Sequence, residues 1–428
     1  MNAQPLLGQG SADRPLTEEE TRRIVAAAAD AMRPDGQRVL VIVPDHTRTC
    51  PLPALARALR ADLAGRAARL DFLVALGTHP PLDQAHLDKL FGVPSGRWAD
   101  VFGDSKVYNH DWRNADALAH VGTLTEEEVE EISGGLFRMS VDVTVNKRLF
   151  DYDRVLILGP VFPHEVVGFS GGNKYFFPGI CGEALLNFFH WLGAVITNPK
   201  IIGTKHTPVR ATVDRAAGLL KMDKFALCLV VSHEGLMGMY FDTPERAWSA
   251  AADLSSRVHV RYVDKPYRSI LAQAPRMYDD IWTGGKCMYK MEPVVADGGE
   301  LIIYAPHITE VSTTHGTVIE AIGYHTRDYF LAQWERFKGY PWGVLAHSTH
   351  VRGIGSYAGG VEKCRVQVTL ATGISEARCR KINLGYRDPA SIDVADWEGK
   401  EEQGRLYVPK AGEYLYKLKN PPAWQTFA

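Results

Sequence analysis

The chain of 428 residues is 46% hydrophobic and 23% charged, an ordinary balance for a globular protein with room for two or three domains. Its 48 basic and 50 acidic side chains give a net charge of -2, which argues against a general nucleic-acid binder, because such binding needs a basic face. The six cysteines include no C-x-x-C pair, which argues against a disulfide scaffold or a thiolate zinc site. The first twenty residues contain no basic segment followed by an apolar run, and no window resembles a membrane span, so we expect a cytoplasmic protein.

Helix and strand signals alternate along the first half of the chain. Thr17 and Glu20 form a capping-box pattern before the helical run RRIVAAAADAM. RVLVIVP, residues 38–44, is a short apolar run typical of a buried parallel strand. The signals that follow are a helix PALARALRADL, a strand RLDFLVALG, a helix LDQAHLDKLFG, a capped helix EEEVEEIS, two strands MSVDVTVNK and DRVLILGPV, and a helix GEALLNFFHWLGA.

The second half continues in the same style. Its strand signals are FALCLVVS, VHVRYV, RSILAQA and ELIIYAP, with a helix PERAWSAAADLSSR, a helix over roughly 284–296, and an edge hairpin in RLYVPKAGEYLYKL. This alternation predicts an α/β protein with mainly parallel sheets. A proline in VDKPYRS interrupts strand-like segments, so we expect two α/β domains, residues 1–264 and 265–428.

Ionisable side chains follow several of the predicted strands. Asp45, His46 and Arg48 follow the first strand, His79 follows the next, and His164 follows DRVLILGPV. Open α/β sheets bind ligands at the carboxyl ends of their strands, and an arginine there can hold a carboxylate or a phosphate. Asp45 can orient a histidine or the arginine. Each stretch taken alone favours a turn ion pair or a solvated histidine, and ionisable groups at two successive strand ends favour a functional site. His110 follows a weaker strand candidate.

The stretch FPHEVVGFSGGNKYFFPGICG is rich in glycine. Its Ser170-Gly171-Gly172 turn can bring backbone N–H groups close to a phosphate. The stretch is neither a Walker P-loop nor a dinucleotide fingerprint. His190 lies among Phe188, Phe189 and Trp191, a pattern shared by core histidines and by buried ligands. Lys286 is expected at the start of the 284–296 helix. The amino-terminal end of a helix repels cations and attracts anions, so a lysine there indicates that an anion binds nearby.

Taken together, these stretches resemble the nickel-pincer lactate racemase (LarA) family over nearly the whole chain. Asp45-His46-Thr47-Arg48 corresponds to the family's D-x-T-R, and Gly77-Thr78-His79 to its G-T-H. The family's P-H, S-G-G-x-K and P-G-I motifs occur in order between Pro163 and Ile180. His190, sixteen residues after Lys174, keeps the spacing of the family's nickel histidine. Trp282-Thr283-Gly284-Gly285-Lys286 stands where the family has Tyr-Gln-x-x-Lys.

The resemblance implies an isomerase: a racemase or epimerase of 2-hydroxy acids that acts by reversible hydride transfer to a nickel-pincer nucleotide (nickel pyridinium-3,5-bisthiocarboxylic acid mononucleotide). It implies a site in the cleft between two domains. The resemblance implies that His190 binds the nickel and that Lys174, Ser170, Gly171 and Gly172 contact the cofactor. It also implies that His79 and His164 are the two acid/bases. Arg48 and Lys286 would bind the substrate carboxylate, and Asp45 would orient its neighbours. Trp282 and Thr283 depart from the family pattern, so they predict a different substrate pocket.

Three alternatives stay open at this point. The chain can be a C2-epimerase of polyhydroxy (aldonic) acids, a cofactor carrier or acid-binding homologue without turnover, or a phosphate-binding α/β enzyme without metal. The expected partner is a small-molecule 2-hydroxy acid, with no nucleic acid and no membrane. The sequence leaves open the identity of that acid, the covalent state of Lys174 and the oligomeric state.

Overall fold

The structure is a computed structural model that describes residues 5–427. The first four residues of the N-terminal stretch considered above therefore lie outside the described residues. The packing divides the chain into two compact units. Among the described residues, the first unit contains residues 5–162, Phe169–Leu186 and Arg210–Val258, and the second contains Pro163–Gly168, Asn187–Val209 and residues 259–427. The expected boundary between residues 264 and 265 stays a prediction.

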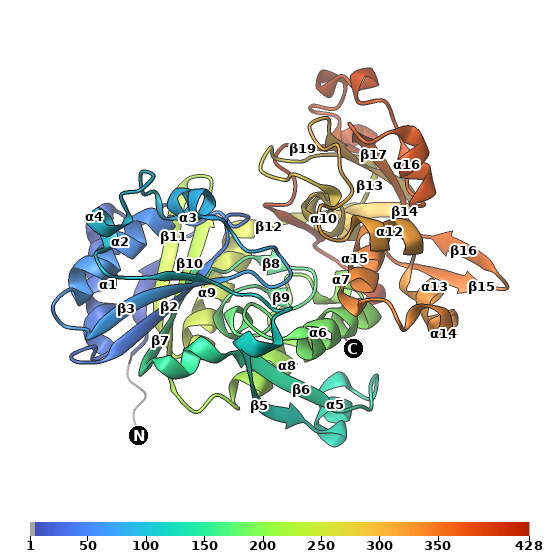
Figure 1. The fold of residues 1–428 in the computed structure, drawn as a ribbon. Coiled ribbons are helices and arrows are strands. Elements are labelled where there is room, and N and C mark those ends of the chain that lie inside the picture. The colour runs from blue at the N-terminus through green and yellow to red at the C-terminus, as the bar shows by residue number, and fades with distance from the viewer. Residues whose placement is uncertain (1–4, 428) are drawn as a thin grey trace. The chain divides into compact units, whose positions relative to one another are not determined.

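The first unit is built on a seven-stranded sheet with the order β1-β11-β10-β7-β2-β3-β4 (Figure 1). Its five parallel strands are β2 (Arg38–Pro44), β3 (Arg69–Ala75), β4 (Val107–Asn109), β7 (Arg154–Pro160) and β10 (Asp223–Ser232). Two antiparallel strands extend it, β11 (Gly235–Asp242) and β1 (Leu7–Gly10). Six of the seven residues of β2 are buried, which explains its nearly continuous apolar sequence, because helices cover both faces of parallel sheets.

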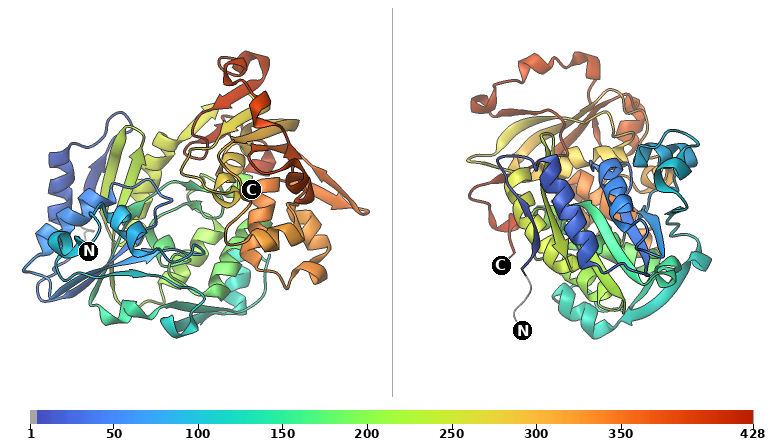
Figure 2. Two further views of the ribbon diagram at one scale, coloured as in Figure 1. Left: turned by 45° about the horizontal axis from the view of Figure 1, so that its top comes forward. Right: turned by 90° about the vertical axis from the view of Figure 1, so that its left-hand side faces the viewer.

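Helices α1 and α2 cover one face of this sheet (Figure 2). The helices associated with the first unit are α1 (Glu18–Ala31), α2 (Leu52–Leu63), α3 (Gln84–Phe91), α4 (Trp98–Phe102), α5 (Glu126–Ser133), α8 (Pro208–Ala217) and α9 (Pro244–His259). The Thr17–Glu20 capping box is present at the start of α1. Alternate residues of β2, such as Val39, Val41 and Val43, pack on Val25 and Leu55 of these helices. The core is therefore a helix layer on a parallel sheet. A separate antiparallel pair joins β5 (Leu118–Leu124) to β6 (Val141–Asn146).

The second unit contains a five-stranded, wholly parallel sheet with the order β18-β17-β14-β13-β19. Its strands are β13 (Tyr267–Gln273), β14 (Val295–Ala305), β17 (Gln367–Thr372), β18 (Gly385–Tyr386) and β19 (Arg405–Val408). The smaller strands of this part of the chain are the parallel pair β12 (Val260–Val263) and β20 (Leu415–Leu418), the hairpin β15 (Gly355–Ala358) and β16 (Val361–Cys364), and the short β8 (Pro163–His164) and β9 (Gly168–Phe169). The remaining helices are α6 (Glu183–Ile196), α7 (Asn198–Ile201), α10 (Ile281–Gly284), α11 (Lys286–Tyr289), α12 (Gly316–Ile322), α13 (Arg327–Ala332), α14 (Trp334–Phe337), α15 (Trp342–Arg352) and α16 (Glu376–Lys381).

The predicted α/β class with mainly parallel sheets is confirmed, but two local predictions are wrong. Residues 284–296 form no single helix: α11 ends at Tyr289 and β14 already begins at Val295. Residues 405–418 form no hairpin, because β19 pairs with β13 and β20 pairs with β12, both in parallel. Within residues 5–427, every helix is too short or too polar to cross a bilayer.

Candidate active site

Asp45 and His79 leave neighbouring strands at the same edge of the first unit's sheet. β2 and β3 run parallel with Pro44 opposite Ala75, so the loops that follow them meet. Asp45 Oδ2 and His79 Nδ1 lie in close hydrogen-bond contact. Asp45 Oδ1 accepts hydrogen bonds from the backbone N–H and the hydroxyl of Thr47, at 3.0 and 2.7 Å. Both carboxylate oxygens are thus engaged, which holds the imidazole in one orientation.

The electrostatics of this edge favour an ionised Asp45. Burial alone would raise the pKa of Asp45, but the charge and hydrogen bond of His79, with smaller contributions from Arg48 and Thr47, hold that pKa well below its ordinary value. Tyr175 is buried close by. Burial raises its pKa far above the ordinary value, Cys50 and Asp45 act in the same direction, and Arg48 opposes them. Three predicted site residues of the first unit, Asp45, Arg48 and His79, therefore share one electrostatic environment beside a neutral phenol.

The Ser170–Gly172 turn has a backbone that only glycine can adopt easily. Gly171 has φ 85° and Gly172 has φ 57°. A Cβ on Gly171 would lie 2.5 Å from Val161 Cγ2, so a side chain there would be both strained and overcrowded. The turn leads into a short 3₁₀ helix, Gly172–Tyr175, whose Lys174 N–H donates to Gly171 O at 3.2 Å.

Backbone hydrogen bonds connect Lys174 to the loop that carries His79. The Gly179 N–H donates to Lys174 O at 3.1 Å, and the Gly77 N–H donates to Gly179 O at 3.0 Å. Gly77 has φ 55°, and a Cβ there would meet nothing nearer than Pro178 O at 4.0 Å. The G-T-H loop and the lysine segment are therefore joined, and the backbone at Gly77 borders open space.

His164 lies in β8 of the second unit and is 8% exposed. Its Nδ1 accepts a hydrogen bond from the Val166 N–H at 3.2 Å and lies 3.2 Å from Glu165 Oε2. Because a backbone N–H can only donate, Nδ1 is an acceptor and the proton of the neutral ring resides on Nε2. We assign this tautomer from the hydrogen bond.

His190 lies on α6, within electrostatic reach of two histidines of α15. Burial lowers the pKa of His350 to about 3 and that of His347 well below its ordinary value, and the proximity of His190 adds to both shifts. The two α15 side chains are therefore neutral imidazoles near neutral pH. Sequence reasoning missed them, although their i, i+3 spacing was a signal that both lie on one helix face.

Trp282 and Thr283 belong to α10, which begins after the N-cap Asp280. The Thr283 hydroxyl donates to Asp280 Oδ1 at 2.8 Å. The Trp282 ring lies 4.3 Å from the His315 ring and 4.2 Å from the His347 ring, measured between centroids. The Trp282 indole is thus packed on two imidazoles, and His315 is a second neighbour that the sequence did not reveal.

Lys286 begins α11, a helix of four residues. The expected argument from a long-helix dipole fails here, because α11 ends at Tyr289. Lys286 Nζ instead lies 4.7 Å from the centroid of the Tyr278 ring, a cation–π arrangement.

His110, the weaker histidine candidate, has a structural environment. Its Nε2 lies 3.0 Å from Cys181 O and its Nδ1 lies 3.2 Å from Asn146 Nδ2, and the ring is fully buried. Both ring nitrogens are engaged with the protein, so the ring has no nitrogen available for a substrate.

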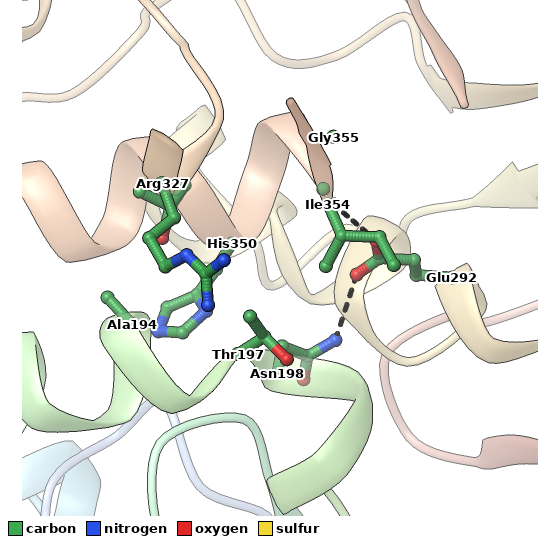
Figure 3. Close-up of a pocket in the computed structure, with 10 residues that line it drawn as sticks. Ala194, Thr197, Asn198, Glu292, Arg327, His350, Ile354 and Gly355 are labelled. Carbon is green, nitrogen blue, oxygen red and sulfur yellow. Dashed lines mark hydrogen bonds between the residues drawn. The ribbon is translucent and has the colours of Figure 1, made fainter. Parts of the chain in front are cut away.

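A small cavity of about 20 Å³ lies beside the end of α6 (Figure 3). His350, Asn198, Arg327 and Glu292 line it, with Thr349 and backbone atoms. The His350 Nε2 and Asn198 Oδ1 atoms are buried there without a protein hydrogen-bond partner. A cavity of this size and polarity suits a single water molecule. It contains none of the predicted site residues.

Comparison with known proteins identifies the first half of the chain. Residues 20–202 match the family described as the lactate racemase N-terminal domain. The lactate racemase of Thermoanaerobacterium thermosaccharolyticum is 28% identical over 177 residues, and that of Lactiplantibacillus plantarum is 24% identical over 274 residues. These alignments span 38% and 62% of this chain, but only 37% and 59% of the two relatives' own lengths.

Two solved structures resemble the fold over nearly the whole chain. A protein from Thermotoga maritima is 33% identical, with a TM-score of 0.87, and the match covers 96% of this chain and all of the other. The lactate racemase apoprotein from T. thermosaccharolyticum has a TM-score of 0.67 at 19% identity, over 96% of this chain and 94% of its own. The order of the motifs, the matched domain and the shared fold agree. Residues 20–202 thus match the lactate racemase N-terminal domain, and the chain is similar to two lactate racemases in sequence and to a lactate racemase apoprotein in fold.

Proposed function

We propose that this protein is a racemase or epimerase of 2-hydroxy acids that uses a nickel-pincer nucleotide and two histidine acid/bases. The observation that carries the proposal is the Asp45–His79 pair at the carboxyl edge of a parallel sheet, with Arg48 in the same electrostatic environment. A histidine oriented by a buried carboxylate beside an arginine is suited to take a proton from a substrate whose carboxylate the arginine holds.

His79 is the base for one enantiomer. Its Nδ1–H donates to Asp45 Oδ2, so the neutral ring keeps its lone pair on Nε2. That nitrogen can accept the proton of a substrate hydroxyl. Asp45 also stabilises the imidazolium that results, because the carboxylate stays ionised.

His164 is the acid for the opposite enantiomer in the resting protein. Its Nδ1 accepts the Val166 N–H, so its Nε2 carries a proton that it can donate. The two histidines thus have complementary tautomers: Nε2 of His79 can accept a proton, and Nε2 of His164 can donate one. Inversion would require the hydrogen on carbon to leave as hydride from one face and return to the other, while one histidine takes the hydroxyl proton and the other returns a proton to the oxygen.

The substrate carboxylate is assigned to Arg48 and Lys286, and the variable part of the substrate to Trp282 and Thr283. A guanidinium gives two parallel hydrogen bonds to a carboxylate, whereas an ammonium gives a point charge. His315 and His347 pack against Trp282, and Nε2 of His347 lies 3.2 Å from the Tyr324 hydroxyl. These polar neighbours favour a hydroxylated substrate chain, which keeps a C2-epimerase of polyhydroxy acids as the second candidate.

The cofactor assignment is supported by residue chemistry. Gly77 borders open space, and Lys174 is joined to it through Gly179, which provides a bare backbone and a cation for an anionic nucleotide. His190 has neutral imidazoles as neighbours, and an imidazole is a suitable nickel ligand. We therefore assign Lys174, Ser170, Gly171 and Gly172 to cofactor binding and His190 to the metal. When bound, such a nucleotide would supply a reversible hydride acceptor.

The test uses cofactor-loaded protein, a panel of 2-hydroxy acids and chiral separation of the products. Conversion of simple acids marks a racemase, and inversion at only one of several stereocentres marks an epimerase. His79→Ala and His164→Ala should each slow interconversion about 10²–10⁴-fold in both directions. The control is His86→Ala, an exposed histidine paired with Asp83.

Near-normal interconversion by both histidine variants would contradict the two-base assignment. Tight cofactor binding without conversion of any acid in the panel would instead support a carrier. ¹⁵N chemical shifts of the two imidazoles provide an independent check, because Nδ1–H and Nε2–H tautomers have distinct shifts.

A further inference from the structure

Side chains from two helices donate hydrogen bonds to three successive carbonyl groups at the Ser170–Gly172 turn, those of Phe169, Ser170 and Gly171. Arg210 Nη2, on α8, donates to Phe169 O at 2.6 Å and to Gly171 O at 3.3 Å. Trp248 Nε1, on α9, donates to Ser170 O at 3.0 Å. Three successive carbonyl groups are thus bound by two side chains, and none of these bonds belongs to regular secondary structure.

The two side chains also contact each other. Arg210 Cζ lies 4.0 Å from the centroid of a Trp248 ring, and Arg210 is 2% exposed. Burial lowers the pKa of Arg210 to about 10, so the guanidinium is charged at neutral pH. Asp214, one turn along α8, lies 3.8 Å from Arg210 Nη1. A buried cation is therefore stacked on an aromatic ring directly against the turn.

The next residue of the chain joins the same network. The Asn173 side-chain amide donates to Asp214 Oδ1 at 3.0 Å and to Glu245 Oε1 at 2.7 Å. A Cβ on Gly172 would lie 2.7 Å from Trp248 Cβ. The turn is consequently fixed through its carbonyls, through one side chain and by direct packing.

We propose that Arg210 and Trp248 are positioning residues: they set the conformation of the Ser170–Gly172 turn and so determine where Lys174 and the Gly171 N–H are presented to a ligand. In a trans peptide the C=O and the following N–H point in opposite directions. Since Ser170 O points to Trp248, the Gly171 N–H points away from it. Gly171 O accepts both from Arg210 and from the Lys174 N–H, so the arginine contacts the same atom that orders the lysine backbone.

The proposal rests on the proposed function in one respect, the ligand, which is taken as a pyridinium mononucleotide. Arg210→Lys keeps the charge but loses the planar guanidinium that stacks on Trp248 while it donates to both carbonyls, and Trp248→Phe keeps a ring but loses the N–H. The matched control is Arg215→Lys, on the same helix, because Arg215 is half exposed and pairs with Glu128. Each variant is examined in the full chain.

Three measurements are made: hydrogen exchange of the peptide spanning residues 168–176, the acylation rate of Lys174 relative to other lysines, and the affinity for nicotinate mononucleotide. Loss of a hydrogen bond to a charged donor corresponds to roughly 10–100-fold. In the Arg210 variant we expect exchange in the turn to accelerate at least tenfold, the acylation rate of Lys174 to change, and mononucleotide binding to weaken by a similar factor. The Trp248 variant loses a neutral donor, so its changes should be smaller, about 3–10-fold. The control should leave all three within about twofold of the unmodified protein.

A purely structural role would lower the melting temperature of both variants without altering local exchange, Lys174 reactivity or binding, and that result would overturn the proposal. If the unmodified chain fails to bind the mononucleotide, the proposed function loses its support. The hydrogen-exchange rate of the turn and the acylation rate of Lys174 then test the positioning role of Arg210 and Trp248 without the mononucleotide.

Discussion

At the residue scale, the Asp45–His79 pair was predictable because it depends on adjacent chain segments. Parallel strands of neighbouring sequence end at one sheet edge, and β2 and β3 are such strands. His347 and His350 were not predictable in the same way. α15 is buried on all sides from Gly343 to Val351, so its sequence shows no contrast between a polar and an apolar face that would single out the two histidines. Their proximity to α6 arises from tertiary packing.

Asp45→Asn tests the orienting carboxylate. The amide cannot stabilise an imidazolium, and it can present its NH₂ to His79 Nδ1 and so favour the wrong tautomer. We expect the turnover of cofactor-loaded protein to fall about 10²–10⁴-fold with little change in fold. The matched control is Asp83→Asn, because Asp83 forms an exposed pair with His86 at 2.7 Å. Equal activity of the two variants would remove Asp45 from the mechanism.

The burial of His110 predicts that the free energy of unfolding depends on pH in a specific range. Burial lowers its pKa to about 4, although Cys181 O and Asp111 act in the opposite direction. The unfolded chain, with an ordinary histidine pKa of ~6.5, binds the proton first. The free energy of unfolding should therefore decrease as the pH falls from ~6.5 to ~4, by at most about 3 kcal/mol, and this contribution should level off below that range.

His110→Gln removes the titrating group while an amide can still bond to Cys181 O. Urea unfolding at several pH values should show a shallower slope between pH ~6.5 and ~4 for the variant than for the unmodified protein. Identical slopes would mean that His110 does not titrate differently in the folded and unfolded chains.

At the element scale, predictions succeeded where local chemistry determines the structure. The capping boxes at Thr17 and Thr125 are both present, because a cap needs only residues three positions apart. The helix expected over 284–296 is wrong partly for a local reason: Pro293 lies inside that range, in the 3₁₀ turn Glu292–Val294, and β14 begins at Val295. Upstream, Asp280 caps the start of α10 and also binds the loop near Thr313, a contact with a distant segment.

Asp280→Ala tests that junction. The variant loses the hydrogen bonds to the Thr283 N–H and hydroxyl and to the Thr313 N–H. We expect unfolding in urea to become easier by about 1–2 kcal/mol, the range for loss of an N-cap. Near-ultraviolet circular dichroism should also change, because Trp282 follows the cap. Asp279→Ala, the exposed neighbour, is the control and should change neither quantity.

At the scale of the whole molecule, the α/β class follows from alternation, but the division of the chain into units does not. The second unit includes Asn187–Val209, a segment that no composition shift or linker marks. Within that unit, Asn198 Nδ2 donates to Tyr289 O at 2.9 Å and to the buried Glu292 at 3.2 Å, and Arg327 donates to Val195 O at 2.8 Å. Such pairings join residues that are distant in sequence, so periodicity cannot reveal them.

Residues 259–428 alone should therefore not fold cooperatively. The fragment lacks Asn198, and the buried Glu292 would lose a donor, which is costly for a carboxyl group. A control fragment that carries residues 187–209 on a flexible linker should recover cooperative unfolding and dispersed amide resonances. A well-folded short fragment would show that the 187–209 segment is dispensable for this unit.

The same segment has a consequence for synthesis on the ribosome. Asn198 precedes its partner Glu292 by 94 residues, so at ~5–20 residues per second the segment waits about 5–20 s for that partner to be made. During this interval the aromatic side chains of α6, including Trp191, lack the Trp334 ring that stacks on Trp191 in the folded chain. Codons that slow translation between these positions lengthen that exposure, so they should lower the yield of native protein without changing a single amino acid.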